Sequence, residues 1–101
     1  MTVLELLKAG REKIVKGWTK YAFKKYGRKR YCAVGAVRSL TDDLHLWVAA
    51  RRELDYTLSA ELDYEDGVYT YNDNSPSKKR VVELYDKTIA RLEKEQQEVA
   101  A

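Results

Sequence analysis

The feature that most constrains the fold is a regular spacing of apolar residues near the C-terminal end. Five of them follow one another at steps of four, four, three and seven residues: Val81, Tyr85, Ile89, Leu92 and Val99. This spacing places all five side chains on one face of an α-helix. With Ser75, Pro76 and Ser77 as start signals, the sequence predicts a helix over 78–95 and a polar, frayed tail over 96–101.

Three more helices are predicted upstream. Thr2 and Glu5 match a capping box at the start of a helix over 3–16, and Gly17 is placed to end it in the left-handed conformation. Residues 31–40, YCAVGAVRSL, form a short helix. Asp42 and Asp43 start another over 43–62, whose apolar stripe is Leu44, Trp47, Val48, Leu54, Leu58 and Leu62.

The segments between these helices carry turn residues. Residues 17–31 contain strand-favouring aromatic residues and Gly27, and predict a loop with short β-like pieces over 19–31. Residues 63–77 predict a second loop, with a brief extended piece over 67–72. A chain of 101 residues has room for one core. We therefore expect an all-α, single-domain bundle of about four helices with two ordered loops.

The single cysteine limits both compartment and chemistry. One Cys cannot form an internal disulfide, and one Cys with one His cannot build a zinc site of the Cys/His type. The N-terminus lacks the order of a secretory signal, and no apolar run approaches the roughly 18 residues of a membrane span. We expect a cytoplasmic protein with no cofactor and no bound metal.

Charge is divided unevenly along the chain. Residues 1–40 contain eleven Lys or Arg and two acidic residues, whereas residues 41–101 contain eight and fourteen. Such asymmetry is typical of a surface that meets nucleic acid or an acidic partner. It is equally compatible with a basic segment that packs against the acidic stretch 53–73 of the same chain. Both interpretations stay open.

The segment Lys20–Tyr31 contains the basic residues on which the first interpretation, a surface for nucleic acid or an acidic partner, mainly depends. Aromatic rings alternate there with six basic residues, a pattern that suits single-stranded nucleic acid because cations meet phosphates and rings stack on bases. No helix-turn-helix, zinc-finger or RNP pattern accompanies it. The alternative is a solvated basic loop that is anchored by its aromatic residues. The nucleic-acid candidates are Lys20, Lys24, Lys25, Arg28, Lys29 and Arg30.

Cys32 is the one candidate nucleophile. It lies at the start of the predicted helix 31–40, where backbone N–H groups lower a thiol pKa, and His45 is the only imidazole available as a base. No nucleophile signature surrounds it. The structural alternative is a packing face, because Cys32, Gly35 and Ala36 lie on one side of a helix with little side-chain bulk. We favour the packing role.

The acidic stretch 53–73 suggests calcium, but the spacing fails. Counting back from Gly67 as the sixth position of an EF-hand loop puts Leu62 at the first position, where Asp is required. The carboxylates are better explained as turn-forming side chains.

Three short motifs together resemble a known family. They are Gly17-Trp18-Thr19, Tyr31-Cys32-Ala33-Val34-Gly35-Ala36 and Tyr71-Asn72-Asp73. The set resembles a family of small uncharacterised proteins from actinobacteria and their bacteriophages, over about residues 3–93. The chain departs from the family pattern at Lys20, where Gln is expected, and at Tyr71, where Trp or Phe is expected. The Lys20 change weakens any role that depends on a glutamine side chain there.

The resemblance implies that the motif residues gather in space. They would form either a pocket for a ligand or partner or a structural bracket, in which the Asn72 amide and Asp73 carboxylate satisfy buried backbone groups or the Thr19 hydroxyl. We favour the bracket. The partner- or ligand-binding candidates are Trp18, Thr19, Lys20, Cys32, Asn72 and Asp73.

Three functions remain, in order of preference. The first is a non-enzymatic accessory protein, phage-encoded as the resemblance implies, that binds a host or phage protein; the tyrosine-rich composition and charge asymmetry favour it. The second is a nucleic-acid-binding module that uses Lys20–Tyr31. The third is a cysteine-dependent enzyme that uses Cys32. A homodimer is compatible with each.

Overall fold

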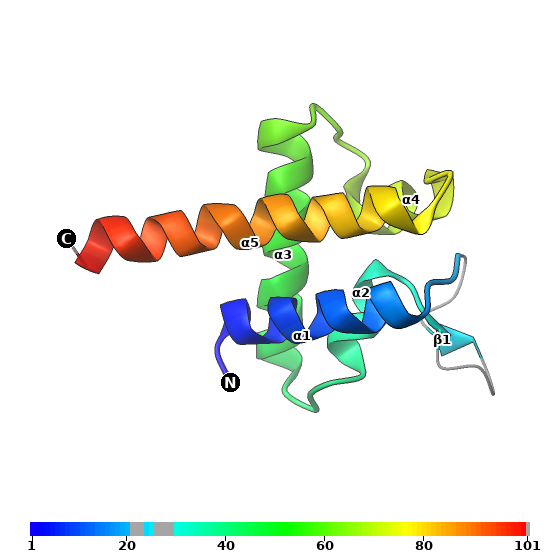
Figure 1. The fold of residues 1–101 in the computed structure, drawn as a ribbon, viewed down its shortest axis with the longest axis horizontal. Coiled ribbons are helices and arrows are strands. Elements are labelled where there is room, and N and C mark those ends of the chain that lie inside the picture. Colours follow the sequence, from blue (N-terminus) through cyan, green and yellow to red (C-terminus); the bar gives the residue numbers. More distant parts are fainter. Residues whose placement is uncertain (21–23, 26–29, 101) are drawn as a thin grey trace.

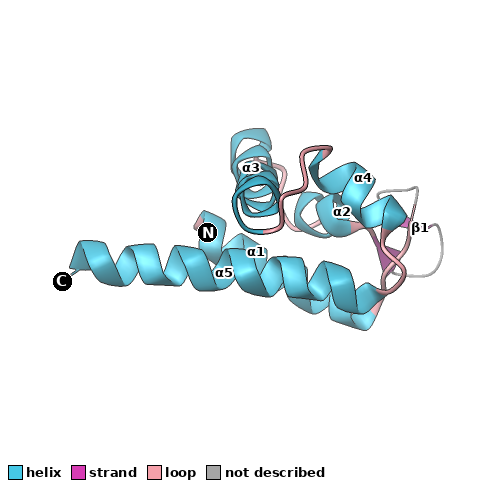
Figure 2. Cartoon of the chain, turned by 90° about the horizontal axis from the view of Figure 1, so that it is seen from above, coloured by secondary structure: helices cyan, strands magenta, loops and turns pink. Residues whose placement is uncertain are grey.

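The computed structural model describes residues 1–20, 24–25 and 30–100, and these form an all-α domain, as predicted. In order, its elements are α1 (Val3–Lys16), β1 (Lys24–Lys25), β2 (Arg30–Tyr31), α2 (Ala33–Arg38), α3 (Leu44–Glu61), α4 (Gly67–Asn74) and α5 (Lys78–Ala100). Figure 1 shows α1 and α5 side by side and antiparallel, with α3 crossing both. Seen from above, α2, α3 and α4 form a second layer over the α1/α5 pair (Figure 2).

The core lies between the two layers. All five helices contribute to it, because each carries an apolar face at helical spacing. On α5, the predicted face is buried at Val81, Tyr85 and Ile89, but Val99 is 88% exposed. The fully buried side chains include Leu6, Leu7, Ile14, Val34, Val37, Leu54, Leu58, Val68, Leu84 and Tyr85.

Helix α1 matches its predicted bounds and its predicted start. The Thr2 side chain accepts a hydrogen bond from the Glu5 backbone, and the Glu5 carboxylate accepts one from the Thr2 backbone, which completes the capping box. The predicted end was wrong in one respect. Gly17 adopts φ −175°, an extended conformation open to any residue, and not the left-handed one.

The second predicted helix is shorter than expected. It runs from Ala33 to Arg38, because Tyr31 pairs in a small antiparallel ribbon with Lys24 and Cys32 becomes the N-cap. A further bridge joins Tyr31 to Trp18. The expectation of short β-like pieces within 19–31 is thus confirmed for residues 24–25 and 30–31.

The predicted extended piece over 67–72 was wrong, because these residues are helical in α4. The neighbouring Asp66 gives no side-chain cap. Instead Asp55 on α3 accepts a hydrogen bond from the Val68 backbone at 2.8 Å. The cap therefore comes from another helix, 13 residues away in sequence. The described residues consequently contain five helices where about four were expected.

Helix α5 starts where predicted and continues to Ala100, five residues beyond the predicted end at 95. Its C-terminal turns project past the rest of the molecule (Figure 1). Residues 94–99 are exposed, so fraying of this tail stays a prediction.

Candidate functional site

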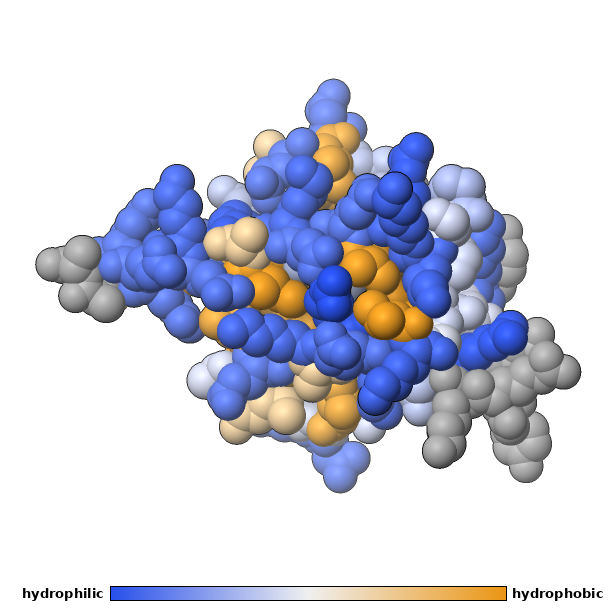
Figure 3. All heavy atoms as spheres, viewed as in Figure 1, coloured by the Kyte–Doolittle hydropathy of each residue, from blue (hydrophilic) through white to orange (hydrophobic). Residues whose placement is uncertain are grey.

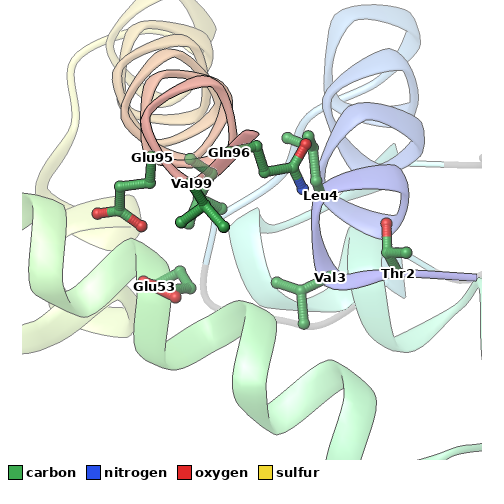
Figure 4. A pocket seen from close by; sticks show the side chains of 8 residues that line it. Thr2, Val3, Leu4, Glu53, Glu95, Gln96 and Val99 are labelled. Carbon is green, nitrogen blue, oxygen red and sulfur yellow. The ribbon is translucent and has the colours of Figure 1, made fainter. Parts of the chain in front are cut away.

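An open groove lies where the beginning of α1, the middle of α3 and the end of α5 meet. Its volume is about 470 Å³. Figure 4 shows its walls as three helices, with the side chains converging between them. The described lining residues are Thr2, Val3, Leu4, Glu53, Leu92, Glu95, Gln96 and Val99.

The floor of the groove is apolar. Leu4 is buried, Val3 and Leu92 are half-buried, and Val99 stands almost fully in solvent. Figure 3 shows the α1/α5 face of the molecule, where hydrophilic side chains cover the projecting end of α5. Val99 faces the groove instead, so the last turns of α5 are amphipathic with their apolar side toward the hollow (Figure 4).

The described lining residues include two carboxylates and no basic side chain. Both carboxylates are held by Arg91, at 3.1 Å for Glu53 and 3.3 Å for Glu95. Arg91 is itself largely buried, with 16% of its side chain exposed, whereas 33% of Glu53 and 56% of Glu95 are exposed. The cation is therefore less exposed than the two anions with which it pairs.

A polar network fixes this wall. Arg91 also donates to the Glu53 carbonyl and to the Thr57 hydroxyl. The buried Thr88 hydroxyl lies 2.7 Å from that of Thr57. The Arg91 guanidinium stacks 4.6 Å from the Tyr56 ring. These bonds join α3 to α5, which form two of the three walls of the groove.

A second constellation surrounds Asn72, which is 1% exposed. Its amide oxygen accepts hydrogen bonds from the Trp18 indole at 2.8 Å and from the Ala33 backbone at 3.0 Å. Its amide nitrogen donates to the Thr19 carbonyl at 3.1 Å. One side chain on α4 thus ties together the end of α1, the start of α2 and the intervening loop.

These contacts bring together most of the residues that the motif resemblance predicted to lie close in space. Asp73 lies 3.4 Å from the Asn72 amide nitrogen, and the Lys20 ammonium lies 5.7 Å from the Trp18 ring. Both hydrogens of the Asn72 amide point at protein acceptors, and its oxygen already has two donors. The arrangement is a structural bracket, because its central amide has no free bonding position for a ligand.

Cys32 is an N-cap and not a displayed nucleophile. Its Sγ accepts a hydrogen bond from the Gly35 backbone at 3.2 Å, and the residue is 6% exposed. Burial raises the pKa of the thiol, and this outweighs the backbone donors that lower it. The only imidazole, that of His45, is exposed on α3. The thiol is therefore protonated and shielded at neutral pH.

The basic segment is only partly described. Tyr31 is buried, with the Lys13 ammonium 4.5 Å from its ring, so this ring is not available for base stacking. Arg30 is exposed, and Lys24 and Lys25 are placed in β1 by their backbone. The predicted roles of Arg28 and Lys29, and of the rings of Tyr21, Phe23 and Tyr26, lie outside the described residues.

The acidic stretch has structural partners. Asp55 caps α4 and pairs with Arg51 at 2.8 Å, and Glu65 accepts a hydrogen bond from Ser59. Within the part of the chain that the structure describes, no three His, Cys, Asp or Glu side chains are grouped as metal ligands. Nor does any described helix combine the length and apolarity that crossing a bilayer demands.

The groove was not predicted from the sequence. Leu92 and Val99 were assigned to the core face of α5, because regular apolar spacing does not show where the neighbouring helices end. The seven-residue step from Leu92 to Val99 was the one sequence signal that the buried face is interrupted, because Gln96, which lies between them on that face, is polar.

Comparison with known proteins gives one match. A model described as a family of unknown function, DUF6197, matches residues 1–91. Neither the curated proteins nor the solved structures contain a match.

Proposed function

Since the chain belongs to the DUF6197 family of unknown function, we propose its role from its own surface. It is a small non-enzymatic accessory protein that binds a segment of another polypeptide in the groove between α1, α3 and α5. The observation that carries this proposal is Val99, an apolar residue 88% exposed at the mouth of a hollow lined by other apolar residues.

Physical chemistry supports a polypeptide ligand. Covering a fully exposed Val side chain is worth about 1.5–3 kcal/mol, and Val3 and Leu92 offer further apolar area. The Arg91 network joins the α3 wall to the α5 wall, so little free energy is lost in ordering these two walls when a partner binds. An open hollow that continues along α5 suits an elongated segment better than a small molecule, which prefers enclosure.

An enzymatic role has less support. Cys32 is capped, buried and protonated, and His45 lies apart on the surface. The setting expected from the motif resemblance, an actinobacterial or phage-infected cytoplasm, belongs to the proposal, and the partner would then be a host or phage protein. Genome context of the family members would test that setting.

Site-specific photo-crosslinking tests the proposal. A benzophenone-bearing residue at position 99 should capture a discrete polypeptide from cell lysate, and the same residue at position 44 should not. Leu44 is a matched control because it is 58% exposed but lies outside the groove. Unlabelled wild-type protein in excess should compete for the adduct.

A Val99→Gln variant separates a real site from general stickiness. Gln favours helix slightly more than Val, so the fold should be unchanged. As a competitor it should be at least about fivefold weaker than wild type, whereas Leu44→Gln should compete fully. Equal crosslinking from positions 99 and 44, or full competition by Val99→Gln, would overturn the proposal.

A further inference from the structure

We propose that the occupant of the groove is a basic amphipathic helix of a different polypeptide. This inference rests on the proposed function and names the chemistry of its partner. The juxtaposition that carries it is an apolar floor, formed by Val3, Leu4 and Leu92 with Val99 at its mouth, beside a rim of carboxylates. An apolar stripe on the partner would face the floor, and Lys or Arg on the flank of that stripe would face the rim.

The sign of the rim is the first argument. Glu53 and Glu95 line the groove, and the described lining residues supply no cation to its surface. Glu98 is exposed one turn beyond Glu95 on the same helix. Arg91 compensates one of these charges. The rim is therefore negative although the whole chain has a net charge of +3.

The same charges disfavour one contact with a second copy of this chain, in which the end of its α5 lies over the groove. That end projects past the rest of the molecule (Figure 1) and carries Glu93, Glu95 and Glu98 against one Lys94. Laying that segment over Glu53 and Glu95 brings like charges together, which is destabilising. A partner with the opposite charge removes this repulsion and gains attraction at the same positions.

The shape of the site is the second argument. Its walls are helices, and the residues along α5 that face it recur as Leu92, Gln96 and Val99, at steps of four and three. Such a row forms the ridge-and-groove surface on which another helix packs. Helix-in-groove recognition uses anchors at the same spacing on the ligand.

Three synthetic peptides test the occupant. The first is a 14-residue Leu/Lys helix with one apolar stripe, the second replaces each Lys by Glu, and the third scrambles the first so that no stripe remains. Each is titrated into the ¹⁵N-labelled chain, and amide shifts are followed at Val3, Glu53 and Val99. We expect the Leu/Lys helix to bind at these positions, and the other two to bind at least about fivefold more weakly.

Variants of the chain locate the interaction. Glu95→Lys should weaken the Leu/Lys helix by roughly two- to fivefold per pair lost, and should strengthen the Leu/Glu helix. Lys87→Glu, a charge change on an exposed α5 residue outside the groove, should leave both unchanged. Glu95 also pairs with Arg91, so helicity of each variant is checked by circular dichroism.

The outcomes separate this inference from the proposed function. If the Leu/Glu helix binds the groove as tightly as the Leu/Lys helix, the groove binds helices but the basic partner is wrong. Sedimentation equilibrium tests for a second copy as the occupant. Dimers that form as the concentration rises, and that the Val99→Gln variant abolishes, would overturn the inference in favour of a second copy. If position 99 captures no polypeptide and none of the peptides shifts the groove, the proposed function itself fails.

Discussion

At the scale of single residues, Asn72 and Cys32 show how the hydrogen-bond partners of one side chain distinguish a binding role from a structural role. The Asn72 amide has a protein partner in every direction. The Cys32 sulfur accepts a backbone hydrogen bond at the start of α2. Both side chains are candidates for binding, and the hydrogen bonds described for both are made to the chain around them.

Replacement of Asn72 by Ala should cost at least about 2 kcal/mol of unfolding free energy, because the Ala33 amide, the Thr19 carbonyl and the Trp18 indole lose their partner. Urea denaturation followed by circular dichroism measures this. Asn74→Ala is the control, since Asn74 is exposed at the end of the same helix. A loss below about 0.5 kcal/mol for Asn72→Ala would show that water replaces the amide at little cost.

The Cys32 thiol should be slow to react in the folded chain. At pH 8 we expect alkylation by iodoacetamide to be about tenfold or more slower than in 8 M urea, because the thiol is buried and its pKa is raised. The Cys32→Ser variant should fold normally, since Ser is a good N-cap. Rapid alkylation of the folded chain would restore the cysteine-enzyme hypothesis.

At the scale of elements, the helices differ in how much of their formation is local. Helix α1 has its capping box within its own first turn, so Thr2 and Glu5 were sufficient to predict its start. Helix α4 depends on Asp55 from α3, and no local pattern contains that information. The groove likewise depends on contacts between helices that are distant in sequence, because it lies where α1, α3 and α5 no longer pack against one another.

Loss of the Asp55 cap should loosen α4 in particular. In the Asp55→Ala variant, the free energy of opening of residues 67–74 should fall by about 1 kcal/mol, which hydrogen exchange measures. Asp66→Ala is the matched control, because Asp66 makes no side-chain cap bond. The Asp55→Asn variant keeps an acceptor oxygen but loses the Arg51 ion pair, so it should behave closer to wild type. Equal exchange in all three variants would contradict the assigned cap.

Gly10 lies where α1 packs tightly against side chains of α2 and α5. A Cβ at this position would lie 2.9 Å from Val37 Cγ1 on α2 and 3.2 Å from the Tyr85 hydroxyl on α5. Sequence reasoning placed the close contact on Gly35 and its small neighbours, because that run has the least bulk. Gly10 lies alone between Ala9 and Arg11, and only the packed structure shows that its missing side chain is needed.

The Gly10→Ala variant should therefore be destabilised by about 1–3 kcal/mol, although Ala favours a helix by about 0.8–1.0 kcal/mol over Gly. The same change in a Val37→Ala background should cost less, since the nearest atom is gone. Thermal or urea unfolding of the four proteins gives the coupling energy. Additive effects of the two changes would show that contact between position 10 and Val37 does not limit how α1 packs against α2.

At the scale of the whole molecule, the chain is one domain that keeps two acidic protons in its core. Burial raises the pKa of the Cys32 thiol and of the Tyr85 phenol. In the unfolded chain these groups ionise near about 8.5 and 10. The stability that their neutral forms contribute is complete below those values and is lost as pH rises above them.

The free energy of unfolding should therefore fall between about pH 8.5 and 10.5, by up to about 1.4 kcal/mol per pH unit for each group, and the urea midpoint should fall with it. Cys32→Ser should flatten the first part of this decline. Tyr85→Phe should flatten the second part, at the cost of lower stability at pH 7, because the phenol donates to the Ala33 carbonyl. A constant midpoint up to pH 10.5 would contradict the buried state of both groups.

The family match covers the structural contacts described above but not the α5 wall of the groove. Residues 1–91 contain the Asn72 bracket, the Cys32 cap and Gly10, so these belong to the part that the family model covers. Leu92, Glu95, Gln96 and Val99 lie beyond it and form the α5 wall of the groove.

The groove is built from segments far apart in the sequence, with Val3 on one side and Val99 on the other. During protein synthesis, the wall that carries Val3 is made well before the opposite wall on α5. At about 5–20 residues per second, several seconds separate the synthesis of the two walls. A partner that needs both walls cannot bind until α5 has been made, so the complex cannot assemble on the first part of the nascent chain.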